Sequence, residues 1–373
     1  MKSIIKPART IVFLIDGLHW KAPGKLHMPV FNALVETGTY INKSYMIVPH
    51  HPTVGEYGRM HTSSFPNPVL QEGTLFVKAG NKMLQDMFAT TDVTAFVANT
   101  QAYTSVSKGF TINVHNPNMS DQQVVEQSID LLNRYDIKYF RMHLQTSGNE
   151  GRYLTYTAVD KPYYRNIWGA GSPYMKHIEI ADQLLGQLIE DLKRTGKWES
   201  TLLIVTSDQG QSEGGWHPII DEDSGITPMV FVGPTIAINR QLPYFEHTDL
   251  TPTIAALMRI DQPNRDGGAG VFMKDVLASQ EATHEHPQYI RTINRQINEY
   301  NALRSKLILA AEKDFYYSSL ISYLENELLT PEPFYHQDRF TEWYRAGTTK
   351  HLIGVNAQLL QRMKQELSKV GVD

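Results

Sequence analysis

The chain of 373 residues contains no cysteine. Thiol catalysis, thiolate metal ligands and disulfide bonds are therefore all excluded, and cysteine usage says nothing about the redox compartment. No run of about 18 apolar residues occurs either, so the sequence predicts no membrane-spanning helix. Positive charge is not in excess: 35 Lys and Arg stand against 39 Asp and Glu, a formal net charge of −4, and no nucleic-acid partner is expected.

A targeting segment is also missing from the sequence as given. Residues 1–9 (MKSIIKPAR) are too short and too interrupted for a secretory signal, so localisation stays open, and an extracytoplasmic location is compatible with a signal that has been removed. Hydrophobic residues make up 41% and charged residues 20% of the chain, as in ordinary globular proteins. At this length, one large α/β domain with an appendage is the natural expectation.

Two short apolar runs each lead to an aspartate. Residues 10–15 (TIVFLI) run into Asp16, and residues 201–205 (TLLIV) lead to Asp208. Both runs have the composition of strands that are buried on both faces. The carboxyl ends of parallel strands meet at one edge of a sheet, so the two carboxylates can converge on one cation if the strands are neighbours. Each aspartate alone is equally well explained as a turn former, whereas the pair favours a site.

A glycine-rich loop follows the second aspartate. It reads SDQGQSEGGWHP and carries Gln209 directly after Asp208 and His217 further along. A strand-end Asp followed by a His on such a loop suits a metal or phosphate site, although a capped turn gives the same pattern.

The segment 49–68 (PHHPTVGEYGRMHTSSFPNP) is dense in His, Ser, Thr, Gly and Pro, as irregular loops are. Within it, Thr53 precedes a stretch that can begin as a helix. A hydroxyl in that place is a helix cap or, beside a metal ion, a nucleophile whose pKa the cation lowers. The histidines of the segment read as polar loop residues.

Four ordered motifs resemble the alkaline phosphatase superfamily, nearest to its type I phosphodiesterase and nucleotide pyrophosphatase branch and more distantly the sulfatases. The motifs are VFLIDGL around Asp16, PTVGEYGRMHTSSFP around Thr53, VTSDQG around Asp208 and HTDLTPTIAALM from His247. The interval of 13 residues from Thr53 to Pro66 matches the spacing in that branch between its nucleophilic Thr and a later Pro. The resemblance covers roughly residues 8–275.

The resemblance implies a metal site that contains Asp16, Thr53 and Asp208, with Thr53 as the nucleophile. It makes His217 the last ligand of a second site. Gln209 stands where the family has the His of Ser-Asp-His-Gly, and an amide oxygen suits Mg²⁺, Mn²⁺ or Ca²⁺ better than Zn²⁺. We therefore expect one divalent cation bound by oxygen ligands.

A second departure from the family lies in LQTSGNEGRY, which begins at Leu144. The family has an Asp and a His there, separated by two residues and a Gly. One register places Gly148 and Arg152 at those positions, and a register three residues earlier places Gln145 and Asn149 there. Either way a complete two-zinc centre is not expected. Arg152 either binds a phosphate or sulfate as a bidentate fork or is a surface residue.

We therefore predict an α/β domain over residues 1–280, a mostly parallel sheet with helices on both faces that resembles alkaline phosphatase. Residues 281–373 are predicted to form a helical extension, which packs on this domain or pairs subunits into a homo-oligomer. The predicted function is metal-dependent hydrolysis of a small-molecule phosphate mono- or diester, with sulfate esters second, through a covalent intermediate on Thr53. The alternative is a degenerate relative that acts as a binding or scaffolding protein. The substrate and leaving group stay open.

Overall fold

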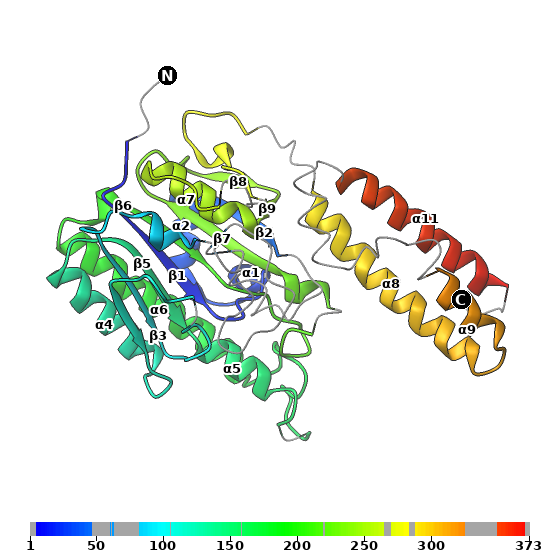
Figure 1. Ribbon diagram of the computed structural model, residues 1–373. Coiled ribbons are helices and arrows are strands. Elements are labelled where there is room, and N and C mark those ends of the chain that lie inside the picture. Colours follow the sequence, from blue (N-terminus) through cyan, green and yellow to red (C-terminus); the bar gives the residue numbers. More distant parts are fainter. Residues whose placement is uncertain are drawn as a thin grey trace.

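The computed structural model describes residues 5–46, 60, 62, 82–104, 106–157, 159–218, 221–264, 270–282, 288–324 and 349–369. The strands within these residues are β1 (Arg9–Ile15), β2 (Thr39–Tyr45), β3 (Val93–Ala98), β4 (Ile112–His115), β5 (Ile137–Leu144), β6 (Thr201–Thr206), β7 (Ile226–Val232), β8 (Arg240–Leu242) and β9 (Phe245–Glu246). They form one sheet with the order β4-β3-β5-β1-β6-β7-β2-β8, and β9 pairs with β2 (Figure 1).

Strand β1 lies between β5 and β6 and is parallel to both. Leu14 stands opposite His143 of β5 on one side and Thr206 of β6 on the other. Parallel pairing continues through β3 and β4, whereas β7 is antiparallel to β6 and β2. The sheet is therefore mostly parallel, and the predicted strands 10–15 and 201–205 are confirmed as neighbours.

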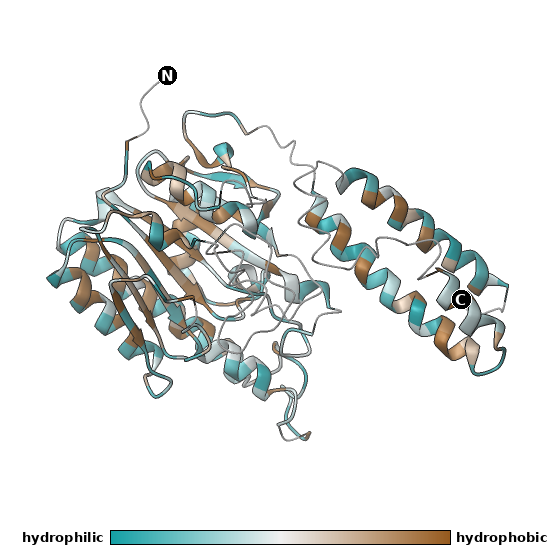
Figure 2. Cartoon of the chain, viewed as in Figure 1, coloured by the Kyte–Doolittle hydropathy of each residue, from teal (hydrophilic) through white to brown (hydrophobic). Residues whose placement is uncertain are grey.

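Helices cover both faces of the sheet, as predicted. The helices are α1 (Ala22–Lys25), α2 (Pro29–Thr37), α4 (Asp121–Arg134), α5 (Thr146–Tyr153), α6 (Pro173–Arg194), α7 (Leu250–Met258), α8 (Tyr289–Ala311), α9 (Tyr316–Tyr323) and α11 (Thr349–Ser368). Helices α2, α4 and α6 pack on the face of β1 that carries Ile11 and Phe13, and α7 packs on the face that carries Val12 and Leu14. Because both faces are covered, β1 is buried along its whole length and is apolar from Ile11 to Ile15, and Figure 2 shows hydrophobic colour along the central strands.

The local sequence explains where α6 begins and ends before the chain enters β6. Pro173 occupies the first turn of α6, where its missing N–H is not needed. Gly196 follows the end of the helix with φ of 68°, a left-handed conformation that glycine adopts without strain. The chain then enters β6, so α6 belongs to the crossover between the parallel strands β5 and β6.

The predicted helical character of the C-terminal residues is confirmed by α8, α9 and α11. These helices share an apolar cluster with Tyr45 and Ile226 of the sheet domain. The side-chain amide of Asn294 in α8 donates a hydrogen bond to the carbonyl of Met46 at 2.7 Å. The boundary near residue 280 and the pairing of subunits stay predictions. None of the helices in the described ranges is long and apolar enough to cross a membrane.

Candidate metal centre

The carboxyl ends of the adjacent strands β5, β1 and β6 bring polar side chains together. Asp16 directly follows β1, Asp208 lies two residues beyond β6, and His143 and Gln145 lie at the end of β5. The backbone N–H of Asp16 donates to the carbonyl of Leu144 at 2.9 Å, which ties the end of β1 to β5. The two aspartates selected from the sequence therefore converge at this edge of the sheet.

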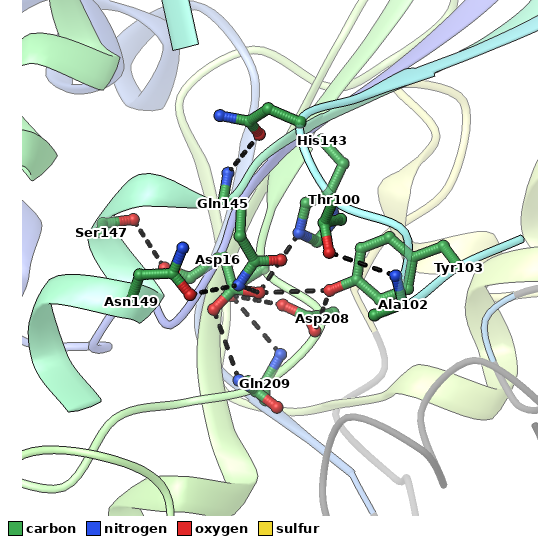
Figure 3. Close-up of polar contacts among 12 residues, drawn as sticks. Asp16, Thr100, Ala102, Tyr103, His143, Gln145, Ser147, Asn149, Asp208 and Gln209 are labelled. Atoms are coloured by element: carbon green, nitrogen blue, oxygen red, sulfur yellow. Dashed lines mark hydrogen bonds and ion pairs between the residues drawn. The ribbon is translucent and has the colours of Figure 1, made fainter. Parts of the chain in front are cut away.

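Asp16 lies at the centre of a hydrogen-bond network (Figure 3). Its Oδ2 atom accepts a hydrogen bond from the side-chain amide of Gln145 at 3.0 Å and lies 3.2 Å from Nε2 of His143. Its Oδ1 atom accepts a hydrogen bond from the side-chain amide of Gln209 at 3.4 Å. Asp16 is only 1% exposed, so these contacts determine the position of its carboxylate.

Tyr103 connects the two aspartates. Its hydroxyl lies 3.2 Å from Oδ2 of Asp16 and 3.2 Å from Oδ2 of Asp208. A phenol has one proton, so it donates to one carboxylate at a time. The buried ring of Tyr103 makes an edge contact with the ring of His143, with 4.2 Å between the centroids. Tyr103 therefore positions both the carboxylate pair and the imidazole.

Burial changes the pKa of each titratable group in this cluster. It raises the pKa of Asp16 from 3.8 to about 7. Burial and the charge of Asp16 raise the pKa of Asp208 to about 7 as well. Burial lowers the pKa of His143 to about 4, so its imidazole is neutral at pH 7. A neutral imidazole is the form that binds metal ions.

The donor set fits a divalent cation. Asp16, His143 and Asp208 each offer one ligand atom, and these atoms all lie within 4.8 Å of one another. Two ligands with bonds of about 2.1 Å to one ion are about 3.0 Å apart when they bind at right angles. The distance of 3.2 Å between His143 Nε2 and Asp16 Oδ2 is close to that spacing. A cation at this position would also offset the repulsion between the two carboxylates.

Both registers considered at the second departure from the family place a residue in contact with Asp16. Gln145 reaches Asp16, and its amide also donates to Oδ1 of Asn149 at 3.5 Å. Gly148 instead packs its backbone against Asp16. Residues of both registers thus lie beside Asp16, and the choice between Gln145 with Asn149 and Gly148 with Arg152 stays open.

Arg152 and His217 lie on either side of Trp216. Arg152 is exposed, and its guanidinium lies 4.6 Å from the centroid of the Trp216 ring. Trp216 stacks on His217 with 4.1 Å between the ring centroids. His217 is buried but is not one of the three residues of the metal cluster. Substrate binding by Arg152 and metal binding by His217 stay predictions.

Thr53 lies outside the described residues, so its roles as nucleophile and metal ligand also stay predictions. In the same segment the structure describes Met60 and Thr62. The carbonyl of Met60 accepts a hydrogen bond from the hydroxyl of Thr251 in α7. The carbonyl of Thr62 accepts one from the side-chain amide of Asn264 at 2.9 Å. These two residues are therefore attached to α7 and to the loop after it.

His143 and Tyr103 are functional candidates that the sequence analysis missed. The available signal for His143 is the strand IKYFRMHL, in which Tyr139, Arg141 and His143 alternate with apolar residues although the strand is central. A buried polar face on a central strand is uncommon and indicates a site. For Tyr103, which follows β3 in an irregular segment, no sequence signal was available.

Gly148 provides a test of the position of Asp16. A Cβ atom added at Gly148 would lie 1.6 Å from Oδ1 of Asp16, so the carboxylate must move if Gly148 becomes alanine. We expect Gly148→Ala to weaken Mn²⁺ binding more than about tenfold, the loss typical when the support of a metal ligand is removed. Isothermal titration calorimetry with Mn²⁺ would measure this change.

Gly354→Ala is the matched control for this substitution. Gly354 also lies inside a helix, α11, but a Cβ atom there meets nothing within 4 Å. Alanine favours the helical backbone over glycine by about 1 kcal/mol in both helices, so helix propensity cannot explain a difference between the variants. Unchanged Mn²⁺ affinity in Gly148→Ala would contradict metal binding by Asp16.

Comparison with known proteins gives a family match and several partial relatives. The Sulfatase family model matches residues 71–260, just over half of the chain. Choline-sulfatase from Rhizobium meliloti (strain 1021) is 32% identical over 99 residues, which are 26% of this chain and 19% of that protein. Bis(5'-adenosyl)-triphosphatase ENPP4 from Homo sapiens is 32% identical over 92 residues, which are 22% of this chain and 20% of that protein. Each match thus spans about a fifth of the length of the curated relative.

Solved structures are similar over most of the chain. BT4656, solved with its substrate D-glucosamine-2-N,6-O-disulfate, has a TM-score of 0.59 at 13% identity, covering 74% of this chain and 81% of that chain. A protein in the alkaline phosphatase superfamily from Vibrio parahaemolyticus has a TM-score of 0.54 at 16% identity, covering 70% and 68%. At these identities the similarity concerns the fold, and it confirms the predicted alkaline phosphatase-like architecture.

Proposed function

The chain belongs to the sulfatase family, and on that premise we propose that it is a metal-dependent hydrolase of a small-molecule sulfate or phosphate ester. The observation that carries the proposal is the buried cluster of Asp16, His143 and Asp208 at the ends of three adjacent strands. Two carboxylates this close in the interior resist ionisation unless a cation accompanies them, and such perturbed groups gather at functional sites.

Two ester classes are candidates for the substrate. The motifs in the sequence favour phosphate mono- and diesters and place sulfate esters second. The Sulfatase family match and the partial match to a choline-sulfatase support sulfate esters, whereas the partial match to a bis(5'-adenosyl)-triphosphatase supports phosphate esters. Both groups are tetrahedral anions whose developing charge a divalent cation stabilises.

The residues have separate tasks in the proposed reaction. Asp16 and Asp208 hold the cation, and the amides of Gln209 and Gln145 orient Asp16 through their hydrogen bonds. A bound divalent cation supplies charge stabilisation and lowers the pKa of a nearby hydroxyl. Thr53 supplies that hydroxyl.

The proposed chemistry consists of two transfers. The Thr53 oxygen loses its proton and bonds to the sulfur or phosphorus atom while the bond to the leaving alcohol breaks, and the alcohol oxygen takes up a proton. Water then attacks the same sulfur or phosphorus atom while its bond to the Thr53 oxygen breaks, and that oxygen takes up a proton. This step releases sulfate from a sulfate ester, inorganic phosphate from a phosphate monoester, or a phosphate monoester from a diester. Arg152 is the candidate for holding the anionic oxygens as a bidentate fork.

A panel of aryl esters tests the proposal. Aryl sulfate, phosphate monoester and phosphodiester substrates are supplied with Mg²⁺, Mn²⁺, Ca²⁺ or Zn²⁺ after the protein has been stripped with a chelator. We expect hydrolysis of one ester class, loss of that activity in the chelator, and recovery with Mn²⁺, Mg²⁺ or Ca²⁺ better than with Zn²⁺. Turnover that is unaffected by the chelator would contradict a metal-dependent mechanism.

The alternative role in binding or scaffolding remains the second candidate because three ligands that the resemblance implies are missing: the imidazole at Gln209, and the Asp and the His of the segment that begins at Leu144. It predicts no turnover of any ester and no stoichiometric metal after loading. Elemental analysis of metal-loaded protein, run beside the ester panel, separates the two functions.

A further inference from the structure

We propose that His143 supplies a nitrogen ligand to the cation held by Asp16 and Asp208. In this way strand β5 replaces the imidazole that the chain lacks at Gln209. The inference rests on the metal site of the proposed function and specifies its composition. It changes the expected ligand set from oxygen alone to two carboxylates and one imidazole.

The position of His143 supports this assignment. Its Nε2 atom lies 3.2 Å from Asp16 Oδ2, and its ligand atom lies within 4.8 Å of those of both aspartates. Ligands of one octahedral ion are about 3.0 Å apart at right angles and about 4.2 Å apart on opposite sides, for bonds of about 2.1 Å. The separation of 3.2 Å thus fits two ligands at right angles, and the other separations exceed the distance between opposite ligands by at most about 0.6 Å, which side-chain rotation can close.

The direction of the imidazole is set by β5 and by its neighbours. His143 is completely buried and stands opposite Leu14, one residue before the end of the strand. The Tyr103 ring contacts it at 4.2 Å between centroids. An imidazole held this way loses little conformational entropy when it binds an ion, which favours metal binding.

An imidazole ligand has a consequence for metal selectivity. Imidazole nitrogen suits the later transition ions including Zn²⁺, and Mn²⁺ accepts it more readily than Mg²⁺ and Ca²⁺, which prefer oxygen ligands. With His143 bound, Mn²⁺ is favoured over Mg²⁺ and Ca²⁺ at this site, and the disadvantage of Zn²⁺ expected from oxygen ligands alone becomes smaller. Without it, the remaining carboxylates and amides would show no such preference for Mn²⁺.

A second group with metal-ligand chemistry must be separated from this site. His19, Glu213 and Asp223 also offer ligand atoms within 4.8 Å of one another. However, the Lys21 ammonium already forms ion pairs with both carboxylates of that group: Nζ lies 2.8 Å from Glu213 Oε1 and 3.6 Å from Asp223 Oδ2. Its charge balances these carboxylates, so a divalent cation has to displace it, and we expect no tight binding there.

Electron spin echo envelope modulation of bound Mn²⁺ tests the inference without reference to activity, because it detects nitrogen nuclei bonded to the ion. We expect ¹⁴N modulation in the wild-type protein and the ¹⁵N pattern when histidine alone is labelled with ¹⁵N. In His143→Gln we expect the modulation to disappear and Mn²⁺ affinity to fall at least about tenfold. Mg²⁺ affinity should change by less than about threefold, because Mg²⁺ gains little from nitrogen.

Two variants control this experiment. His115→Gln removes a half-buried histidine that packs on Phe96 outside the cluster, and Asp223→Asn removes a carboxylate from the second group. Both should keep the modulation and the Mn²⁺ affinity. Modulation that persists in His143→Gln but vanishes in Asp223→Asn would assign the ion to the second group and overturn the inference.

The labelled wild-type protein keeps the inference falsifiable even if His143→Gln does not fold. No Mn²⁺ binding, or bound Mn²⁺ without histidine modulation, overturns it. If histidine modulation is present and no ester is hydrolysed, the ligand assignment stands and the proposed function fails. If esters are hydrolysed with bound Mn²⁺ that shows no histidine nitrogen, the function stands and the ligand assignment fails.

Discussion

Thr53→Ala is expected to lower ester hydrolysis by about 10³-fold or more, because alanine lacks the hydroxyl to which the sulfate or phosphate group is transferred. The basis is the interval of 13 residues from Thr53 to Pro66, together with the convergence of Asp16 and Asp208 that the same resemblance requires. Initial rates on the best ester of the panel, at saturating Mn²⁺, measure the loss. Thermal unfolding of the same samples checks that the fold is intact.

Two further substitutions control the Thr53 experiment. Thr53→Ser keeps a hydroxyl and should retain most of the activity that Thr53→Ala loses. Thr62→Ala removes the hydroxyl of another threonine of the same segment, which is buried and has no task in the proposed reaction, and should leave turnover nearly unchanged. Equal rates in Thr53→Ala and the wild-type protein would remove Thr53 from the mechanism.

The centre of the fold was predictable because its strands carry strong local signals. The runs 10–15 and 201–205 are buried on both faces, so they are apolar after their first residues, Thr10 and Thr201, and are followed by polar residues. Parallel strands in an open sheet present their carboxyl ends at one edge, which brings Asp16 and Asp208 together once the strands are neighbours. Burial pattern and topology thus locate two of the three residues of the metal cluster from sequence alone.

The third residue of the cluster, His143, lies on a strand that the sequence analysis did not identify. In β5, Tyr139, Arg141 and His143 face one side of the sheet, and their polarity disguises a central strand. His143 contributes because β5 pairs with β1 in a register that places it opposite Leu14. Such a register is a property of tertiary pairing, and no single segment specifies it.

Because β5 was not predicted from the sequence, the motifs indicated only oxygen ligands. Gln209 was recognised as a replacement for an imidazole, and the inference of oxygen ligands followed from the motif residues alone. The structure places another imidazole, that of His143, beside Asp16 at 3.2 Å. Residues from different strands can therefore restore a type of ligand that one motif has lost. The amides of Gln145 and Asn149, in contrast, are weak metal ligands, which is consistent with one cation and not two.

Asp208→Asn is expected to lower Mn²⁺ affinity at least about 100-fold, because an amide replaces one of the two charged ligands. The same substitution should stabilise the metal-free protein at pH 8 by about 1–3 kcal/mol, because it removes repulsion between two buried carboxylates. Calorimetric Mn²⁺ titrations and denaturant unfolding in a chelator, at pH 5 and pH 8, measure the two effects.

The pH dependence follows from the pKa values of Asp16 and Asp208, which rise from 3.8 to about 7 on folding. Between these values the native state binds more protons than the unfolded state, so the metal-free wild-type protein loses stability as pH rises from about 4 to about 7. The advantage of Asp208→Asn should therefore be large at pH 8 and small at pH 5.

Asp182→Asn is the control, because Asp182 is also buried but accepts hydrogen bonds from the backbone N–H of Phe31 at 2.7 Å and of Val30 at 3.0 Å. It should destabilise the protein at both pH values and leave Mn²⁺ affinity unchanged. A wild-type protein that is as stable at pH 8 as at pH 5 in the chelator would show that the two carboxylates are not held together without metal.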